Sequence, residues 1–184
     1  MNFRFLSALV FGVFGVALLC GLGVWQVQRM HWKNALMADI NARIGGDPIA
    51  IPATPDPEAD RYRPVFADGT FTGEHLYVLS GQKEVGAGVR VISVLQTTDG
   101  RRVLVDRGFL AEADKAAPLT VTDVRITGNL MWPRDADSFT PPPDPKTGMW
   151  FARDAVAMAA QLQTEPTFIV ASAPTGDGIE ALGV

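Results

Sequence analysis

The chain has 184 residues, of which 47% are hydrophobic and 20% are charged, and its formal net charge is −4. This length allows one domain with an appendage. A mildly acidic chain without a basic block lacks the clustered cations that phosphate binding requires, which excludes a nucleic-acid-binding protein. The single cysteine, Cys20, excludes a disulfide framework and a multi-thiolate metal site. Two histidines, His31 and His75, are too few for a histidine-rich catalytic metal site.

Residues 1–24 are predicted to form a transmembrane anchor. From Phe5 to Val24 the sequence carries no charge, and a helix of this length spans roughly 30 Å, the thickness of the hydrocarbon core of a bilayer. No small-residue cleavage site precedes Trp25, which favours an uncleaved anchor over a signal peptide. Flanking charge alone slightly favours a cytoplasmic soluble domain, since Arg29 and Lys33 follow the span.

The helical pattern continues beyond the span. Apolar residues recur at helical spacing at Trp25, Trp32, Leu36 and Ile40. This predicts a juxtamembrane helix over 25–46, which Gly45-Gly46 ends. Residues 47–60 contain four prolines and are predicted to form an extended linker.

Residues 61–172 are predicted to form a soluble β-rich domain. Strand-like runs, separated by Gly, Asp or Pro, occur at 62–71, 74–80, 89–97, 102–110, 119–130 and 167–171. Asp99-Gly100 predicts a hairpin between the third and fourth runs. Prolines make 133–148 a loop, and apolar spacing predicts one helix over 153–162. The fold class is therefore α+β, with an N-terminal transmembrane helix before a mainly antiparallel, barrel-like domain, and 173–184 as a flexible C-terminal tail.

The residues offer little catalytic chemistry. The chain has no glycine-rich phosphate loop, no G-x-S-x-G and no Ser–His–Asp set, so we predict that it is not an enzyme and holds no metal. Asp135 and Asp137 lie in the proline-rich loop without the third ligand of a calcium loop, which favours a solvated turn. His31 follows the span at a depth where it could bind heme as an axial ligand, or serve as an ordinary polar boundary residue. Arg107 lies in an apolar strand and requires an acidic partner if it is buried.

Four motifs in chain order carry a family resemblance. The first, L-G-V-W-Q-V-Q-R-M-H-W-K, begins at Leu22; Y-R-P-V begins at Tyr62 and is followed by G-T-F at Gly69; L-V-D-R-G-F begins at Leu104; and W-x-x-x-D begins at Trp150. Together they resemble the surfeit-locus-one (Surf-one/Shy-one-like) family, assembly factors for heme-A-containing cytochrome c oxidase. The residues that match its signature are Trp25, Gln26, Arg29, Trp32, Lys33, Tyr62, Arg63, Pro64, Gly69, Phe71, Arg107 and Gly108. Asp106 and Phe109 depart from it, where the family pattern has Asn and Trp.

The resemblance implies a non-enzymatic, inner-membrane assembly factor whose soluble domain faces the periplasm, against the orientation that charge alone favours. It implies that the chain assists heme A placement in oxidase subunit I, with heme A as a transient cofactor. Its expected partners are subunit I, other oxidase or assembly components, and the membrane. A permanent accessory subunit or interaction module of a respiratory-chain complex is the alternative, and a heme-modifying enzyme is a third.

The family pattern also ends in a second transmembrane helix, which carries the proposed heme ligand. Residues 170–184 are too short and interrupted to span a bilayer, so that ligand cannot be assigned to any residue of this chain. The expectation is that the chain is either truncated or a divergent member that binds protein partners.

Overall fold

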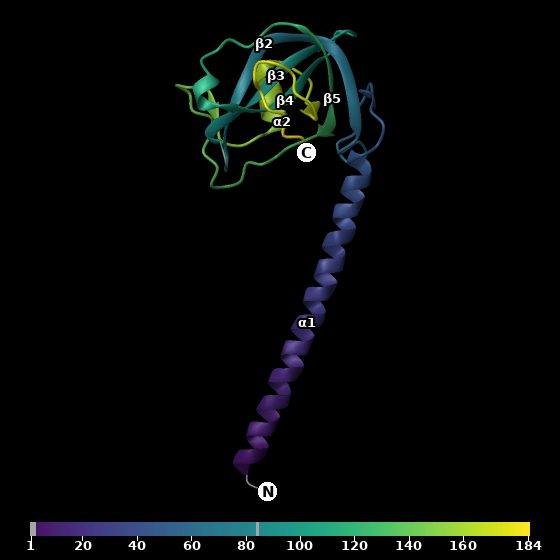
Figure 1. The fold of residues 1–184 in the computed structure, drawn as a ribbon, viewed down its shortest axis with the longest axis vertical. Helices are drawn as coiled ribbons and strands as arrows, with labels where there is room; N and C mark the ends of the chain where they lie inside the picture. Colours follow the sequence, from purple (N-terminus) through teal and green to yellow (C-terminus); the bar gives the residue numbers. More distant parts are fainter. Residues whose placement is uncertain (1–2, 84) are drawn as a thin grey trace. The chain divides into compact units, whose positions relative to one another are not determined.

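A long N-terminal helix begins the computed structural model, which describes residues 3–83 and 85–184 (Figure 1). α1 runs over Phe3–Ile44, and from Leu9 onward it is long and apolar enough to span a membrane, with an 18-residue window of mean hydropathy 2.0. The predicted anchor and juxtamembrane helix therefore form one continuous helix, which ends before Gly45-Gly46 as predicted. Residues 1–2, placed by the sequence at the start of the anchor, lie outside the described residues. One compact unit ends at Ala42, and a second begins at Arg43.

The second unit is built on a barrel-like sheet. Its elements are β1 (Ile49–Ala50), β2 (Pro64–Gln82), β3 (Gly86–Thr97), β4 (Arg102–Ala111), a 3-10 turn (Glu112–Asp114), β5 (Asp123–Met131), β6 (Met149–Trp150), α2 (Ala155–Leu162) and β7 (Phe168–Ala171). The strand order is β1-β2-β3-β4-β7-β5, and β5 also pairs with β2, so the pairings return to β2. The long pairings β2–β3, β3–β4 and β2–β5 are antiparallel, whereas the short pairings β1–β2, β2–β6 and β4–β7 are parallel. These findings confirm the predicted α+β, mainly antiparallel and barrel-like class.

β2 is one long strand where the sequence predicts two with a break at 72–73. Its pairing with β3 shifts register between Phe71 and His75, which marks a bulge. Gly73 lies in the bulge with a φ of 86°, a conformation that favours glycine. On its other edge β2 pairs with β5 over 64–70 and with β6 near its end. The sheet is therefore barrel-like rather than a regular closed barrel, because β2 changes partner along its length.

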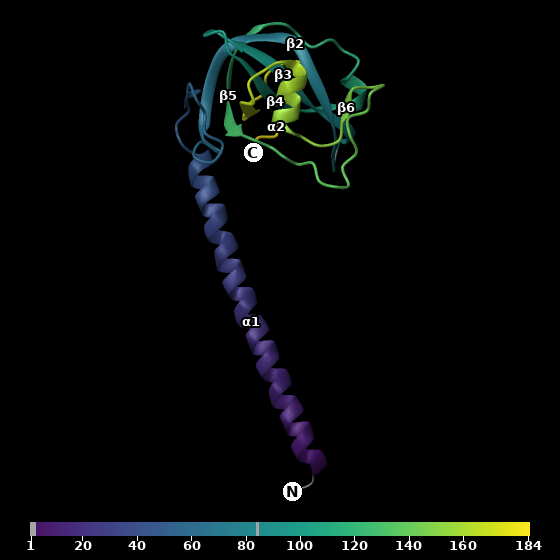
Figure 2. The same cartoon turned by 180° about the vertical axis from the view of Figure 1, so that it is seen from behind.

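Apolar side chains pack on both faces of this sheet. One cluster fills the space that the strands enclose, with fully buried members Phe71, Leu95, Val103, Val105, Ile126, Leu130 and Ile169. On the outer face, α2 lies against the strands of the sheet (Figure 2). A second cluster there includes Leu104, Trp150, Met158 and Phe168. Successive residues of β4 thus alternate between the two clusters, as strand geometry requires. Burial of each large apolar side chain contributes about 1.5–3 kcal/mol.

α2 is the helix predicted for the soluble domain, and its ends follow from local chemistry. A carboxylate oxygen of Asp154 accepts hydrogen bonds from the backbone N–H groups of Val156 and Ala157, each at 3.0 Å, and so caps the helix. Gln163 takes a left-handed φ of 53° and ends it. The buried face has helical spacing and consists of Ala155, Met158 and Ala159.

The predicted linker 47–60 is partly incorporated into the domain. β1 lies within it and pairs with the start of β2. Asp60 is buried, and its carboxylate accepts a hydrogen bond of 2.9 Å from the backbone N–H of Asp56. The prolines of this segment indicate an extended chain, but they carry no signal for its pairing with β2.

Residues 173–184 pack on the domain, which corrects the prediction of a flexible tail. Ile179 is buried in a third cluster with residues of β3 and β4, namely Val89, Val91 and Leu110. Glu180 and Phe109 exchange backbone hydrogen bonds of 2.8 and 2.9 Å. The sequence signal failed here because a short, glycine-rich segment shows no periodicity, and its contacts lie some 70 residues earlier in the chain.

Candidate functional site

The first signature motif lies on α1, where its side chains are exposed. The guanidinium of Arg29 lies 5.3 Å from the centre of the Trp25 ring, one helical turn away, which is a cation–π contact. The remaining predicted residues of this motif are also exposed: Gln26, His31, Trp32 and Lys33. This helix therefore presents aromatic, cationic and imidazole groups outward.

The second motif fixes the entry to β2, which begins at Pro64. Tyr62 has a φ of 68°, an unfavourable value for an aromatic residue, and such strain requires support from its surroundings. That support comes from β5, since the N–H of Tyr62 donates to the carbonyl of Leu130 at 2.8 Å and its carbonyl accepts from the Asn129 amide at 2.9 Å. Arg63, which is exposed, pairs with Asp60 at 2.5 Å.

Gly69 lies where β2 pairs with β3 and β5 at once. A Cβ atom at this position would lie 2.3 Å from the carbonyl oxygen of Gln96, so a larger residue would push β3 away. This signature glycine therefore permits the close approach of neighbouring strands.

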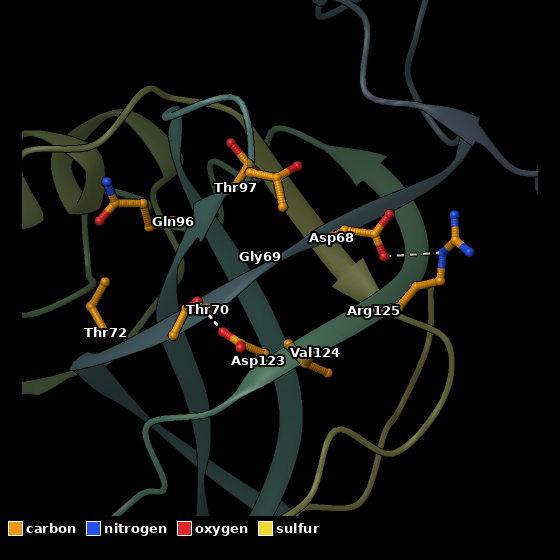
Figure 3. Close-up of a pocket in the computed structure, with 10 residues that line it drawn as sticks. Asp68, Gly69, Thr70, Thr72, Gln96, Thr97, Asp123, Val124 and Arg125 are labelled. Atoms are coloured by element: carbon orange, nitrogen blue, oxygen red, sulfur yellow. Dashed lines mark hydrogen bonds and ion pairs between the residues drawn. The ribbon is translucent and has the colours of Figure 1, made fainter.

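A polar hollow of about 610 Å³ surrounds Gly69 (Figure 3). The carboxylate of Asp68 on β2 lies 3.3 Å from Nε of Arg125 on β5 and forms an ion pair with it. The hydroxyl of Thr70 donates a hydrogen bond of 2.5 Å to the carboxylate of Asp123. The lining consists of Asp68, Gly69, Thr70, Thr72, Gln96, Thr97, Thr98, Asp123, Val124 and Arg125. Both carboxylates already have partners, and the other polar groups are hydroxyls and an amide. The hollow therefore offers hydrogen-bonding contacts rather than a nucleophile with an adjacent general base.

The structure brings Phe71 and Arg107, from separate motifs, into contact. Arg107 is 1% exposed, and its guanidinium lies 4.5 Å from the centre of the Phe71 ring. It pairs with Asp177 at 2.8 Å and donates from Nε to the Thr175 hydroxyl at 2.7 Å. Arg107 is therefore buried and paired with an acidic residue, as predicted. We call Phe71, Arg107, Thr175 and Asp177 the Arg107 cluster.

Asp177 joins three segments of the chain. Its carboxylate accepts hydrogen bonds from the hydroxyl and N–H of Thr120, at 2.5 and 3.1 Å, as well as from Arg107. Burial alone would raise the pKa of Asp177, but the hydrogen bonds from Thr120 and Arg107 outweigh it and bring that pKa below its ordinary value. Sequence reasoning predicted the need for an acidic partner but missed Asp177, because no local signal links residues 70 positions apart.

Gly108 holds the C-terminal segment close to β4. Its φ is 114°, and a Cβ atom there would lie 1.9 Å from the carbonyl oxygen of Glu180. We expect Gly108→Ala to destabilise the domain by more than about 1 kcal/mol, since it combines backbone strain with a clash.

Gly100→Ala is a matched control for this prediction, because Gly100 also has a positive φ, of 87°, but has open space around it. Urea unfolding of the two variants separates the cost of backbone strain from the cost of the clash. An equal loss of stability in both would show that the clash with Glu180 adds nothing to the loss.

A second charged group lies on the outer side of β4. Asp106 is fully buried and accepts hydrogen bonds from Arg90 Nε at 2.9 Å and Arg153 Nη1 at 3.3 Å. Arg153 also donates to Asp135 at 2.7 Å. Burial alone would lower the pKa of Arg153, but these two carboxylates outweigh it and the pKa rises. The charges alternate along this network, which indicates a structural role.

Comparison with known proteins gives the family. A family model described as the SURF1 family matches residues 13–181, a range that contains all four motifs. The chain belongs to the SURF1 family. Surfeit locus protein 1 of Rattus norvegicus is 32% identical over 172 residues, covering 81% of this chain, and the protein of that name from Homo sapiens is 32% identical over 176 residues, covering 83%. A SURF1-like protein of Dictyostelium discoideum is 30% identical over 190 residues, covering 81% of the chain and 70% of its own length.

The chain spans a little over half of the rat and human SURF1 relatives, 56% and 58% of their lengths. The matched range includes most of the apolar helix and nearly the whole second unit. Family membership therefore applies to the anchor and the barrel-like domain together. Within the described part of the chain, no group of three or more His, Cys, Asp and Glu side chains is placed to hold a metal ion.

Proposed function

We propose that this chain is a membrane-anchored, non-enzymatic assembly factor for heme-A-containing cytochrome c oxidase, which assists heme A placement in subunit I. The observation that carries the proposal is the SURF1 family match over residues 13–181. The apolar helix supports it, because a protein that handles a membrane-embedded subunit benefits from being held in the same bilayer. The polar hollow and the signature side chains supply contact groups suited to holding a partner.

The proposed location is the inner membrane, with the soluble domain in the periplasm. The partners would be subunit I and other oxidase or assembly components. His31 fits the chemistry of a transient heme A ligand, since its imidazole is exposed on α1 beside Trp32. A single helix cannot enclose a porphyrin, so a partner helix would supply the remaining surface.

Deletion of the gene is expected to lower the heme-a absorbance of the membranes, while complexes without heme A keep their levels. Expression of the full chain should restore the absorbance. An unchanged oxidase spectrum in the deletion strain would contradict the proposal. Mild purification distinguishes the alternative role, because a chain that stays stoichiometric in mature oxidase would be an accessory subunit rather than an assembly factor.

A further inference from the structure

The loop between β5 and β6 exposes an aromatic side chain. Phe139 is 90% exposed, more than any other large hydrophobic residue whose side chain the structure describes. Burial of an aromatic ring is strongly favourable, so a partner that covered this ring would gain binding energy. Phenylalanine is among the aromatic residues that are enriched at the centres of protein interfaces.

The turn that carries Phe139 is well ordered. One carboxylate oxygen of Asp137 accepts hydrogen bonds from the N–H of Phe139 and the hydroxyl of Thr140, both at 2.9 Å. The hydrogen bond from Thr140, followed by that from Phe139, lowers the pKa of Asp137, so its carboxylate stays ionised. Three successive prolines, Pro141–Pro143, stiffen the chain directly after the turn. The ring is therefore presented by a preorganised turn, which reduces the entropy lost on binding.

A mainly apolar hollow of about 230 Å³ lies beside this turn. Thr140, Pro141–Pro143, Trp150 and Phe151 are among the residues that line it. Trp150 is 7% exposed, and its indole N–H has no acceptor within the described part of the chain. The aromatic and proline side chains of the hollow offer apolar surface that a partner side chain could cover. We call Asp137, Phe139 and this hollow the Phe139 surface.

We propose that the Phe139 surface docks a protein: Phe139 enters an apolar socket with a basic rim on the partner, and an apolar side chain of the partner enters the hollow. The charge beside Phe139 favours a protein over a lipid surface. Asp137 lies two residues before the ring and is ionised, whereas residues that insert into anionic bilayers are usually accompanied by Lys or Arg. The choice of partner, an oxidase component, rests on the proposed function.

Site-specific crosslinking tests the proposal in native membranes. A photoreactive phenylalanine analogue at position 139 of the full chain should crosslink to an oxidase subunit. The same analogue at Val121, which is 62% exposed and lies on another segment, should not. Crosslinking of position 139 to lipid, or to no oxidase component, would overturn the proposal.

Coprecipitation supplies an independent measurement with matched variants. Phe139→Ser should reduce the recovery of oxidase subunit I with the tagged full chain by about tenfold or more, Phe139→Leu should retain most of it, and Val121→Ser should match wild type. Unchanged recovery with Phe139→Ser, together with normal restoration of heme-a absorbance, would overturn the docking surface and leave the proposed function standing. Failure of the wild-type chain itself to restore heme-a absorbance would overturn both.

Discussion

Replacement of Arg107 by alanine is expected to lower the free energy of unfolding of the soluble domain by about 3–5 kcal/mol. The substitution removes a cation that is 1% exposed and leaves the carboxylate of Asp177 without its ion pair. It also removes the contact with the Phe71 ring and leaves a cavity between the strands. Because Arg107 also donates to the hydroxyl and the carbonyl of Thr175, the loss should loosen the C-terminal segment from β4 as well.

Arg125→Ala is a matched control for this prediction. Arg125 makes the same kinds of contact, an ion pair with Asp68 at 3.3 Å and a ring contact with Phe66 at 4.5 Å, but its side chain is 62% exposed. Water screens such a pair, so its loss should cost less than about 1 kcal/mol. Urea unfolding of the full chain in detergent, followed by tryptophan fluorescence, measures both variants. Equal destabilisation by the two substitutions would contradict the role assigned to burial of Arg107.

The contribution of Asp177 should also depend on pH in a defined direction. Its folded pKa lies below the ordinary value of 3.8, so the folded domain binds the proton less readily than the unfolded chain. The stability from this carboxylate is therefore present above about pH 4 and is lost as the pH falls through the folded pKa. The difference in stability between wild type and Asp177→Asn should shrink in that acidic range, and a constant difference would show that the charge does not matter.

The fold was predictable where its signals are local. The hairpin at Asp99-Gly100 and the strands on both sides follow from turn chemistry and alternating apolar residues, and α2 follows from helical spacing after the cap at Asp154. The pairing of β2 with β5, and its register, could not be predicted, because the paired residues lie about 60 positions apart in the chain. β6 has only two residues and owes its pairing to contact with β2.

The sequence indicated which residues belong to the candidate site, but not which side chains they contact. A buried Arg107 requires a carboxylate, yet its partner Asp177 lies in a segment without periodicity, for which the sequence predicts a flexible tail. The sequence does not distinguish Phe139, because a single phenylalanine in a proline-rich loop does not reveal its exposure. Its role as a contact residue depends on the turn built by Asp137, which only the structure displays.

Replacement of Asp106 by alanine is the second large expected loss, again about 3–5 kcal/mol. Asp106 is fully buried between Arg90 and Arg153, so its removal leaves two guanidinium groups facing each other without the charge that separates them. Arg153 keeps its pair with Asp135, whereas Arg90 has no other ion pair within the described residues.

Asp106→Asn separates charge from shape at this position. It keeps an acceptor for the N–H of Gly108, now 3.2 Å from the carboxylate, but loses the charge that balances the two arginines. We therefore expect a smaller loss than for alanine, and the double variant Arg90→Ala with Asp106→Ala should lose less than the sum of the single variants. Additive losses in urea unfolding would contradict the pairing. Arg153 and Asp135 join this network to the start of the loop that carries Phe139, so we expect the loss of Asp106 to disturb that end of the loop as well.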